Sequence, residues 1–271
     1  MGLLVLVLLV FPMIYMARLS ASEFVQGRVG AHGFTLEQYG KVLIDLYYYR
    51  IVLRTAGMSL LVSVLSLILA FPISFHLARR ASRMRGMLIF LIILPIMVGV
   101  VVRSYGWIVL LASEGPINQA LIALRVIEAP IELMNTWTAV IIALTEIMLP
   151  FMILPLTSAI ERINPAVEEA ARTLGASPFR VFKEVTMPLA MPGVVSGLIL
   201  VFSLTITSYA TPALLGGPSA TVIASLIVEQ MLTAFNWPLG SALALLLVAI
   251  TAVATGGGLL LSRTRRAERH S

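Results

Sequence analysis

Residues 164–188 read NPAVEEAARTLGASPFRVFKEVTMP, and this stretch indicates what kind of chain this is. Asn164 followed by Pro165 has the form of a helix N-cap with proline at the first helical position. Gly175 is the usual type of residue at a helix end. The stretch therefore predicts a short first helix over residues 166–174.

A second start signal follows directly. Ser177-Pro178 repeats the pattern of a capping residue and a proline. Pro188 lacks a backbone N–H, so we expect the second helix to reach a break there. Two brief helices joined by a tight turn are predicted.

The first of these helices is amphipathic. Four apolar residues share one face at i, i+3, i+4 and i+7, namely Val167, Ala170, Ala171 and Leu174. The charged residues are expected elsewhere on its surface: Glu168, Glu169 and Arg172. Small alanines let another backbone approach closely, which suits a helix that docks into a groove on a partner protein. A helical hairpin lying at the lipid surface satisfies the same pattern.

The composition around this stretch is that of a membrane protein. Of the 271 residues, 59% are hydrophobic and 12% are charged, whereas soluble domains usually carry about 25% charged residues. The apolar residues occur in blocks that approach the ~20 needed to cross a bilayer. The chain has no cysteine, and its three histidines are too scattered to suggest a metal cluster: His32, His76 and His270.

Six membrane spans are predicted, over residues 2–17, 55–78, 87–111, 136–160, 193–211 and 239–261. Three of the segments between or after them, 79–86, 161–192 and 262–271, fall on one side and hold four Lys/Arg residues each. The side richer in these cations should face the cytoplasm, with both chain termini. The net charge of +6 therefore reflects membrane orientation, and no nucleic-acid partner is expected.

The pattern of Glu169-Ala170-Ala171, Gly175 and Val185-x-Met187-Pro188 resembles the EAA loop of binding-protein-dependent ABC importer permeases. That family places isoleucine at the position of Val185 and leucine at that of Met187, so both departures are apolar. Much of the chain is similar to permeases of the spermidine/putrescine type. The strings that carry this similarity are Phe34-Thr35-Leu36-Glu37-Gln38-Tyr39, Leu149-Pro150-Phe151-Met152, Glu161-Arg162-Ile163, Pro212-Ala213-Leu214-Leu215-Gly216-Gly217 and Asn236-Trp237-Pro238.

The resemblance implies an all-α polytopic membrane protein with the type I ABC importer (MetI-like) fold. It divides the chain into residues 1–54, a first transmembrane helix plus a periplasmic segment, and residues 55–271, a core permease domain with the coupling loop 161–192. The loop would contact an ATPase subunit through Glu168, Glu169, Ala170, Ala171, Leu174, Gly175, Ala176 and Phe179.

The resemblance also implies partners. They are two ATPase subunits, a second permease subunit in a heterodimer and a periplasmic substrate-binding protein, all at the bacterial inner membrane. The sequence contains no G-x-x-x-x-G-K-[ST] phosphate loop, so ATP and Mg²⁺ are expected on the ATPase and no cofactor on this chain. We expect a transport subunit that forms half of a translocation pathway and not an enzyme.

Two charges lie within the predicted spans, and intramembrane charges are functional candidates by default. The carboxylate of Glu146 suits a cationic substrate, Arg103 lies nearer the outer end of its span, and a direct pair between them is one arrangement to test. Further candidates for the substrate path are Tyr105, Tyr209 and Glu229.

Several alternatives stay open at the level of sequence. The same machine could carry an opine, an amino-acid derivative, thiamine, sulfate or ferric iron. A secondary transporter or channel working alone would show inverted repeats, and no repeat is found. An intramembrane metalloprotease would need a string such as H-E-x-x-H, which the sequence lacks. A true start of the chain upstream of Met1 is a further alternative.

Overall fold

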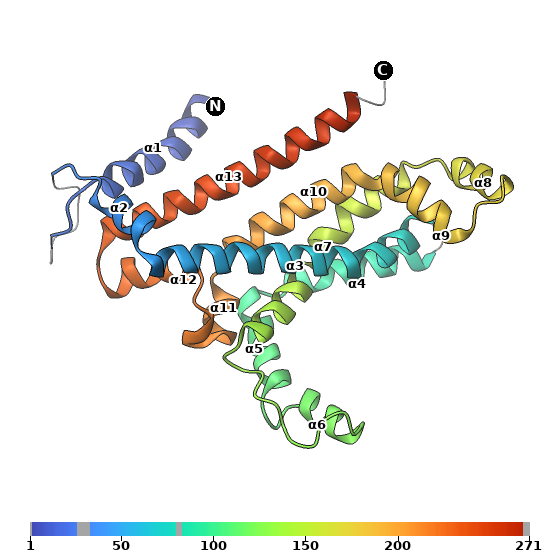
Figure 1. Cartoon of the computed structure of the whole chain (residues 1–271), viewed down its shortest axis with the longest axis horizontal. Coiled ribbons are helices and arrows are strands. Elements are labelled where there is room, and N and C mark those ends of the chain that lie inside the picture. The colour runs from blue at the N-terminus through green and yellow to red at the C-terminus, as the bar shows by residue number, and fades with distance from the viewer. Residues whose placement is uncertain (1, 26–32, 80–82, 268–271) are drawn as a thin grey trace.

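The computed structural model describes residues 2–25, 33–79 and 83–267, and within these ranges it is helical with no strand. Figure 1 shows an elongated bundle of long helices with shorter ones at its ends and on one side. The long helices are α1 (Gly2–Ser20), α3 (Leu46–Arg79), α4 (Arg83–Met97), α7 (Trp137–Glu161), α10 (Met187–Ile206) and α13 (Trp237–Ala267). The shorter elements are α2 (Glu37–Ile44), α5 (Val100–Leu111), α6 (Pro116–Ala123), α8 (Pro165–Thr173), α9 (Pro178–Val181), the π-helix η1 (Phe182–Thr186), α11 (Ala210–Leu215), the 3₁₀ helix η2 (Gly217–Ala220), α12 (Ile223–Val228) and the π-helix η3 (Glu229–Thr233). The predicted all-α class is confirmed.

The centre of the bundle is formed by α3, α7 and α10, which pack directly on one another. The face of α3 toward this centre is lined by buried small residues: Ser59, Ser63, Ser66, Ala70 and Ser74. Ser74 donates to the Ile153 carbonyl of α7 at 3.2 Å. Small side chains let membrane helices approach closely, and their hydroxyls bond across the interface.

Glycines on α10 serve the same close approach. Gly193 faces Ala159 and the backbone of α7, and Gly197 faces Met152, so neither position has room for a side chain without a shift of its neighbours. On its other side α10 contacts α13, and α1 lies beside α13 (Figure 1).

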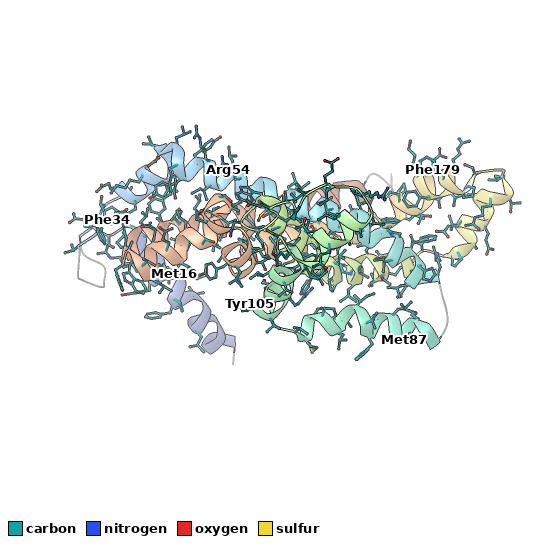
Figure 2. All side chains as sticks on the ribbon, turned by 90° about the horizontal axis from the view of Figure 1, so that it is seen from below. Met16, Phe34, Arg54, Met87, Tyr105 and Phe179 are labelled. Atoms are coloured by element: carbon teal, nitrogen blue, oxygen red, sulfur yellow. The ribbon has the colours of Figure 1, made fainter. Side chains whose placement is uncertain are left out.

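The two ends of the bundle differ in what they carry. Figure 2 places Phe34 at one end and Phe179 at the other. The first end holds α2 and α12, and the second holds α8 and α9, whereas α13 runs from the first end and stops apart from α8 (Figure 1). The predicted coupling loop is therefore at the opposite end from the predicted periplasmic segment.

Among the residues that the structure describes, four helical segments are long and apolar enough to cross a membrane: Leu46–Arg79, Trp137–Glu161, Pro178–Ile206 and Trp237–Gly258. A fifth follows if the bent pair Arg85–Met97 and Val100–Ala123 is one span. The apolar α1, with 19 residues, is not among these, so the total of six remains a prediction. Three residues named above, Met1, His32 and His270, lie outside the described ranges.

The predicted span over residues 87–111 is not one straight helix but a bent pair. The chain bends by 95° between α4 and α5. Pro95 cannot donate a helical hydrogen bond, and Gly99 is extended at φ −55°, ψ 142° as the N-cap of α5. Proline and glycine together end one helix and start the next.

The expected break at Pro188 is wrong. The structure continues from α9 through η1 into α10 as one segment, Pro178–Ile206. Pro188 lies inside this continuous segment, directly after the π-helix η1, and local π-helical turns let a membrane helix accommodate a proline. The five residues of η1 make the transition. The predicted span 193–211 consequently starts earlier and ends at Ile206.

Two other boundaries shift. The helix that contains the predicted second span begins at Leu46, before residue 55, so the division between residues 54 and 55 falls inside α3. The sequence also predicts a short, non-spanning helix over residues 222–232, and α12 with η3 occupies residues 223–233. Its position relative to a membrane stays a prediction.

Candidate functional site

Capping residues determine where the short helices in the loop between α7 and α10 begin and end. The Asn164 side chain accepts a hydrogen bond from the Ala166 N–H at 3.0 Å and starts α8. Gly175 has φ +87°, a left-handed conformation that glycine adopts at no steric cost. Ser177 accepts from the Arg180 N–H at 3.4 Å and starts α9. These predicted start and stop residues are confirmed.

The apolar face of α8 points away from the bundle. Leu174 is 88% exposed, and Phe179 of α9 is 72% exposed close by in the chain. Val167, Ala170 and Glu169 are also exposed, whereas Ala171 and Ala176 are half-buried. Exposed large apolar residues that are contiguous indicate an interaction surface, which here is small and lies at the end of the molecule.

Glu168 differs from the other residues of this group. The sequence places it on the surface of α8, but its side chain is 7% exposed and points into the molecule. It forms an ion pair with Arg79 at 2.8 Å and accepts a hydrogen bond from the Thr186 hydroxyl at 2.8 Å. The expectation of an outward Glu168 is therefore wrong, because two polar partners from other elements hold it inside.

A second charged group lies where α4, α5 and α7 meet. Arg103 of α5 and Glu146 of α7 form an ion pair with Nη2 and Oε1 2.5 Å apart. The indole N–H of Trp107 donates to the other carboxylate oxygen at 3.3 Å. Arg103 also donates to the Pro95 carbonyl at 3.4 Å, which links the pair to the bend between α4 and α5. The direct pair that the sequence left open is present.

The exposure of this pair is uneven. The Arg103 side chain is 10% exposed, whereas that of Glu146 is 38% exposed. The carboxylate therefore keeps an open side in this chain, although the arginine and the indole already occupy both of its oxygens. A cationic ligand reaching Glu146 would compete with Arg103 for the same oxygen.

The remaining path candidates are exposed residues of α5, of the turn before α11 and of η3. Tyr105 is 56% exposed and Tyr209, which precedes α11, is 43% exposed. Glu229 is exposed at the start of η3. Within the described residues no hydrogen bond or ion pair joins any of these three to Arg103 or Glu146.

Sequence reasoning missed the partners of Glu168. Arg79 looked like one member of a basic loop that sets topology, and Thr186 carried no signal at all. One feature of the sequence could have suggested Arg79 as a partner. It lies at the end of an apolar span, where a long side chain can reach a neighbouring element.

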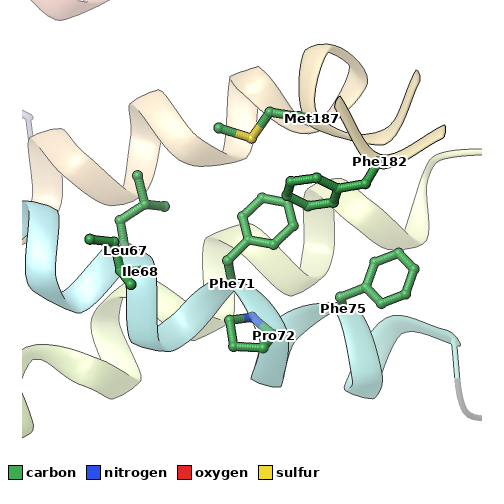
Figure 3. Close-up of a pocket in the computed structure, with 7 residues that line it drawn as sticks. All are labelled: Leu67, Ile68, Phe71, Pro72, Phe75, Phe182 and Met187. Atoms are coloured by element: carbon green, nitrogen blue, oxygen red, sulfur yellow. The ribbon is translucent and has the colours of Figure 1, made fainter. Parts of the chain in front are cut away.

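An apolar hollow of about 480 Å³ lies between α3 and the start of α10. Figure 3 shows its lining, which comes from α3 on one side and from Phe182 and Met187 on the other. Phe71 and Phe182 meet edge to face with centroids 5.1 Å apart. In the part of the chain that the structure describes, no group of three or more His, Cys, Asp or Glu side chains could hold a metal ion.

Comparisons with known proteins give consistent matches. The family described as "Binding-protein-dependent transport system inner membrane component" matches residues 33–266. The spermidine/putrescine transport system permease protein PotB of Salmonella typhimurium (strain SL1344) is 37% identical over 217 residues, covering 80% of this chain and 75% of that protein. The protein of the same name from Escherichia coli (strain K12) is 36% identical and covers 80% and 78%.

A solved structure shares the fold. The crystal structure of a bacterial alginate ABC transporter, in complex with an alginate pentasaccharide-bound periplasmic protein, contains a chain that superposes with a TM-score of 0.76. The match covers 97% of this chain and 92% of that chain at 18% sequence identity, so it supports the architecture alone.

Proposed function

Because this chain belongs to the family of binding-protein-dependent transport system inner membrane components, we propose that it forms half of the translocation pathway of an importer for polyamines. It is a multi-pass inner-membrane permease subunit of an ABC importer. Hydrolysis of ATP takes place on a separate subunit. The cargo, the pathway and the residues that serve them are the proposal.

The observation that carries the proposed coupling role is the outward apolar face of α8. Leu174 and Phe179 are large apolar residues left exposed at one end of the molecule, next to the small residues Ala170 and Ala171. A short helix of this kind fits a groove on a partner, with the alanines allowing close backbone approach. We assign this face, with Glu169, Gly175 and Ala176, to contact with the ATPase.

The cargo is inferred from Glu146 together with the relatives' names. A polyamine carries several ammonium groups, and a partly desolvated carboxylate attracts them. In the proposed cycle an ammonium of the substrate replaces the Arg103 guanidinium on Glu146. Because Arg103 also holds the Pro95 carbonyl, its release would free the bend between α4 and α5. Tyr105, Tyr209 and Glu229 are proposed to line the outer approach.

The proposed assembly has two different permease subunits, two ATPase subunits and one periplasmic binding protein. The coupling loop and both chain termini face the cytoplasm. ATP and Mg²⁺ are held by the ATPase, and this chain binds no cofactor. Movement of α8 during ATPase closure changes the access of the pathway from one side to the other.

The test is purification of the tagged complex from detergent-solubilised membranes, followed by ATPase assays. We expect an ATPase and a second permease to co-purify, and spermidine-loaded binding protein to stimulate hydrolysis. Co-purification without stimulation by polyamines would support the proposed ABC importer assembly but contradict the proposed polyamine cargo. Transport by the chain alone would overturn the coupling role.

A variant sharpens the coupling test. Ala170→Glu puts a bulky charge on the apolar face and should reduce ATPase co-purification by about tenfold or more, since an unpaired charge at a docked surface costs more than about 1.4 kcal/mol. Arg172→Gln, on the polar side of α8, is the matched control and should co-purify normally. Equal recovery of the ATPase with both variants contradicts the assignment.

A further inference from the structure

Arg79 and Glu168 join two elements that are far apart in the sequence. Arg79 is the last residue of α3 and is 19% exposed, and Glu168 lies in α8 with 7% of its side chain exposed. Their charged groups are 2.8 Å apart. A buried charge is tolerated when it is paired and hydrogen-bonded. Here both terminal nitrogens of Arg79 and one carboxylate oxygen of Glu168 have partners, whereas Arg79 Nε has none.

The same two side chains reach two further segments. Arg79 uses its other terminal nitrogen to donate to the Ile163 carbonyl at 3.0 Å, just beyond the end of α7. Glu168 accepts from Thr186, the last residue of η1, at 2.8 Å on the oxygen that also contacts Arg79. One polar cluster therefore ties α8 to α3, to the end of α7 and to η1. We call Arg79, Glu168 and Thr186 the polar clamp.

The apolar packing near the polar clamp is the reason to assign it a mechanical role. Beside it, α3 and η1 are separated by the apolar hollow of about 480 Å³, bridged by Phe71 and Phe182 (Figure 3). The Arg79 guanidinium lies over the ring of Phe75 at 5.9 Å, and Phe75 is one of the residues that line the hollow. Loose apolar packing permits sliding, whereas a charge pair with directed hydrogen bonds holds two elements in one relative position.

We infer that the polar clamp transmits movement of α8 to α3, so that Glu168 acts as a positioning residue inside the permease and not as a contact to the ATPase. This inference rests on the proposed coupling role of α8. The outward face of α8 receives the displacement, and its inward Glu168 passes it to Arg79 at the end of the membrane-spanning α3.

The experiment compares transport with hydrolysis in the complete transporter reconstituted in liposomes. Labelled putrescine uptake and ATP hydrolysis are measured for wild type, Glu168→Gln, Arg79→Lys and the double variant Arg79→Glu/Glu168→Arg. We expect Glu168→Gln to keep the ATPase bound while putrescine taken up per ATP falls about tenfold, as expected for loss of a hydrogen bond to a charged group. Arg79→Lys keeps a charge but loses the fork to Ile163, so an intermediate loss is expected. The double variant should recover a large part of the loss, because the pair is restored with reversed charges.

Arg180→Gln is the matched control, since it breaks an exposed ion pair with Glu184 in the same loop. It should leave uptake per ATP unchanged. If Glu168→Gln lowers uptake and hydrolysis in equal proportion, or matches wild type in both, the inference is overturned. If neither single variant assembles, the double variant decides: assembly with normal uptake per ATP supports the clamp, and assembly with uncoupled hydrolysis overturns it.

Failure of the proposed function gives a different pattern. In that case wild type itself takes up no putrescine or binds no ATPase, and Ala170→Glu has no effect on ATPase recovery. The clamp is tested separately by the ratio of a variant's coupling to that of wild type. If putrescine is not the cargo, the coupling that is compared is the stimulation of ATP hydrolysis by the binding protein.

Discussion

At the scale of single residues, Glu146 is a charged and partly exposed side chain in the middle of a predicted span. Replacing it with glutamine keeps the size and removes the charge. We expect putrescine uptake in liposomes to fall by about tenfold to a hundredfold, because a charge-assisted contact contributes roughly 1.5–3 kcal/mol. The measurement is the initial rate of labelled putrescine uptake at saturating ATP.

The chain offers a matched control on the same helix. Glu161 also pairs with an arginine, Arg85, but at the end of α7 and with both side chains about one-third exposed. Glu161→Gln should change uptake less than about fivefold, since exposed ion pairs contribute at most about 1 kcal/mol. Similar losses in both variants would mean that Glu146 has no special relation to the cargo.

The charged residues also show which parts of the candidate site can be predicted from the sequence. Arg103 and Glu146 are visible because charges are rare within apolar spans, and the structure pairs them. Glu168 is different. Helical spacing shows which residues share a face of α8, but it does not show which face packs against the rest of the protein. Its burial depends on Arg79, which is 89 residues away in the chain, and no local pattern contains that distance.

At the scale of elements, the glycines of α10 determine how closely two helices pack. A methyl group at Gly193 would collide with Ala159 and come close to the Pro155 carbonyl of α7. We expect Gly193→Ala to lower the free energy of unfolding by about 1–3 kcal/mol, because overpacking forces the helices apart. Thermal unfolding of the purified complex in detergent measures the effect.

Gly57 provides the comparison within the same bundle. It lies in α3, and apart from its chain neighbours and the nearby backbone of α3 itself, no atom comes within 4 Å of the position that an alanine methyl group would take there. Gly57→Ala should leave stability unchanged or raise it by about 0.5–1 kcal/mol, since alanine favours helix. A Gly193→Ala protein as stable as Gly57→Ala would contradict the close packing of α7 and α10.

The elements that sequence predicts well are those with caps or uniform apolar runs. Asn164, Gly175 and Ser177 act locally, and α8 and α9 begin and end as they require. The bend after Pro95 and the continuity through Pro188 depend on neighbours. A proline in a membrane helix permits either a break or, beside a π-helical turn, a continuous segment, so the packing of the adjacent helices decides which one occurs.

At the scale of the whole molecule, the distribution of charge supports the proposed orientation, with α8 on the cytoplasmic side. The end that carries α8 and Phe179 holds the Lys/Arg-rich segment 161–192, and the opposite end carries Phe34 (Figure 2). Cations are retained on the cytoplasmic side during insertion. In Figure 1, α1 runs from the N-terminus toward the end that holds α2, so its first residue points the same way as the end of α13.

This orientation predicts which positions a membrane-impermeant maleimide can reach. The natural chain has no cysteine, so each introduced cysteine reports on one site without background. In intact spheroplasts we expect Phe34→Cys to be labelled, because Phe34 is 71% exposed at the outer end. Gly2→Cys and Ser271→Cys should be labelled after permeabilisation alone. Labelling of Gly2→Cys but not of Ser271→Cys in intact cells would mean that α1 does not cross the membrane beside α13, whereas labelling of both would reverse the orientation and remove α8 from the reach of a cytoplasmic ATPase.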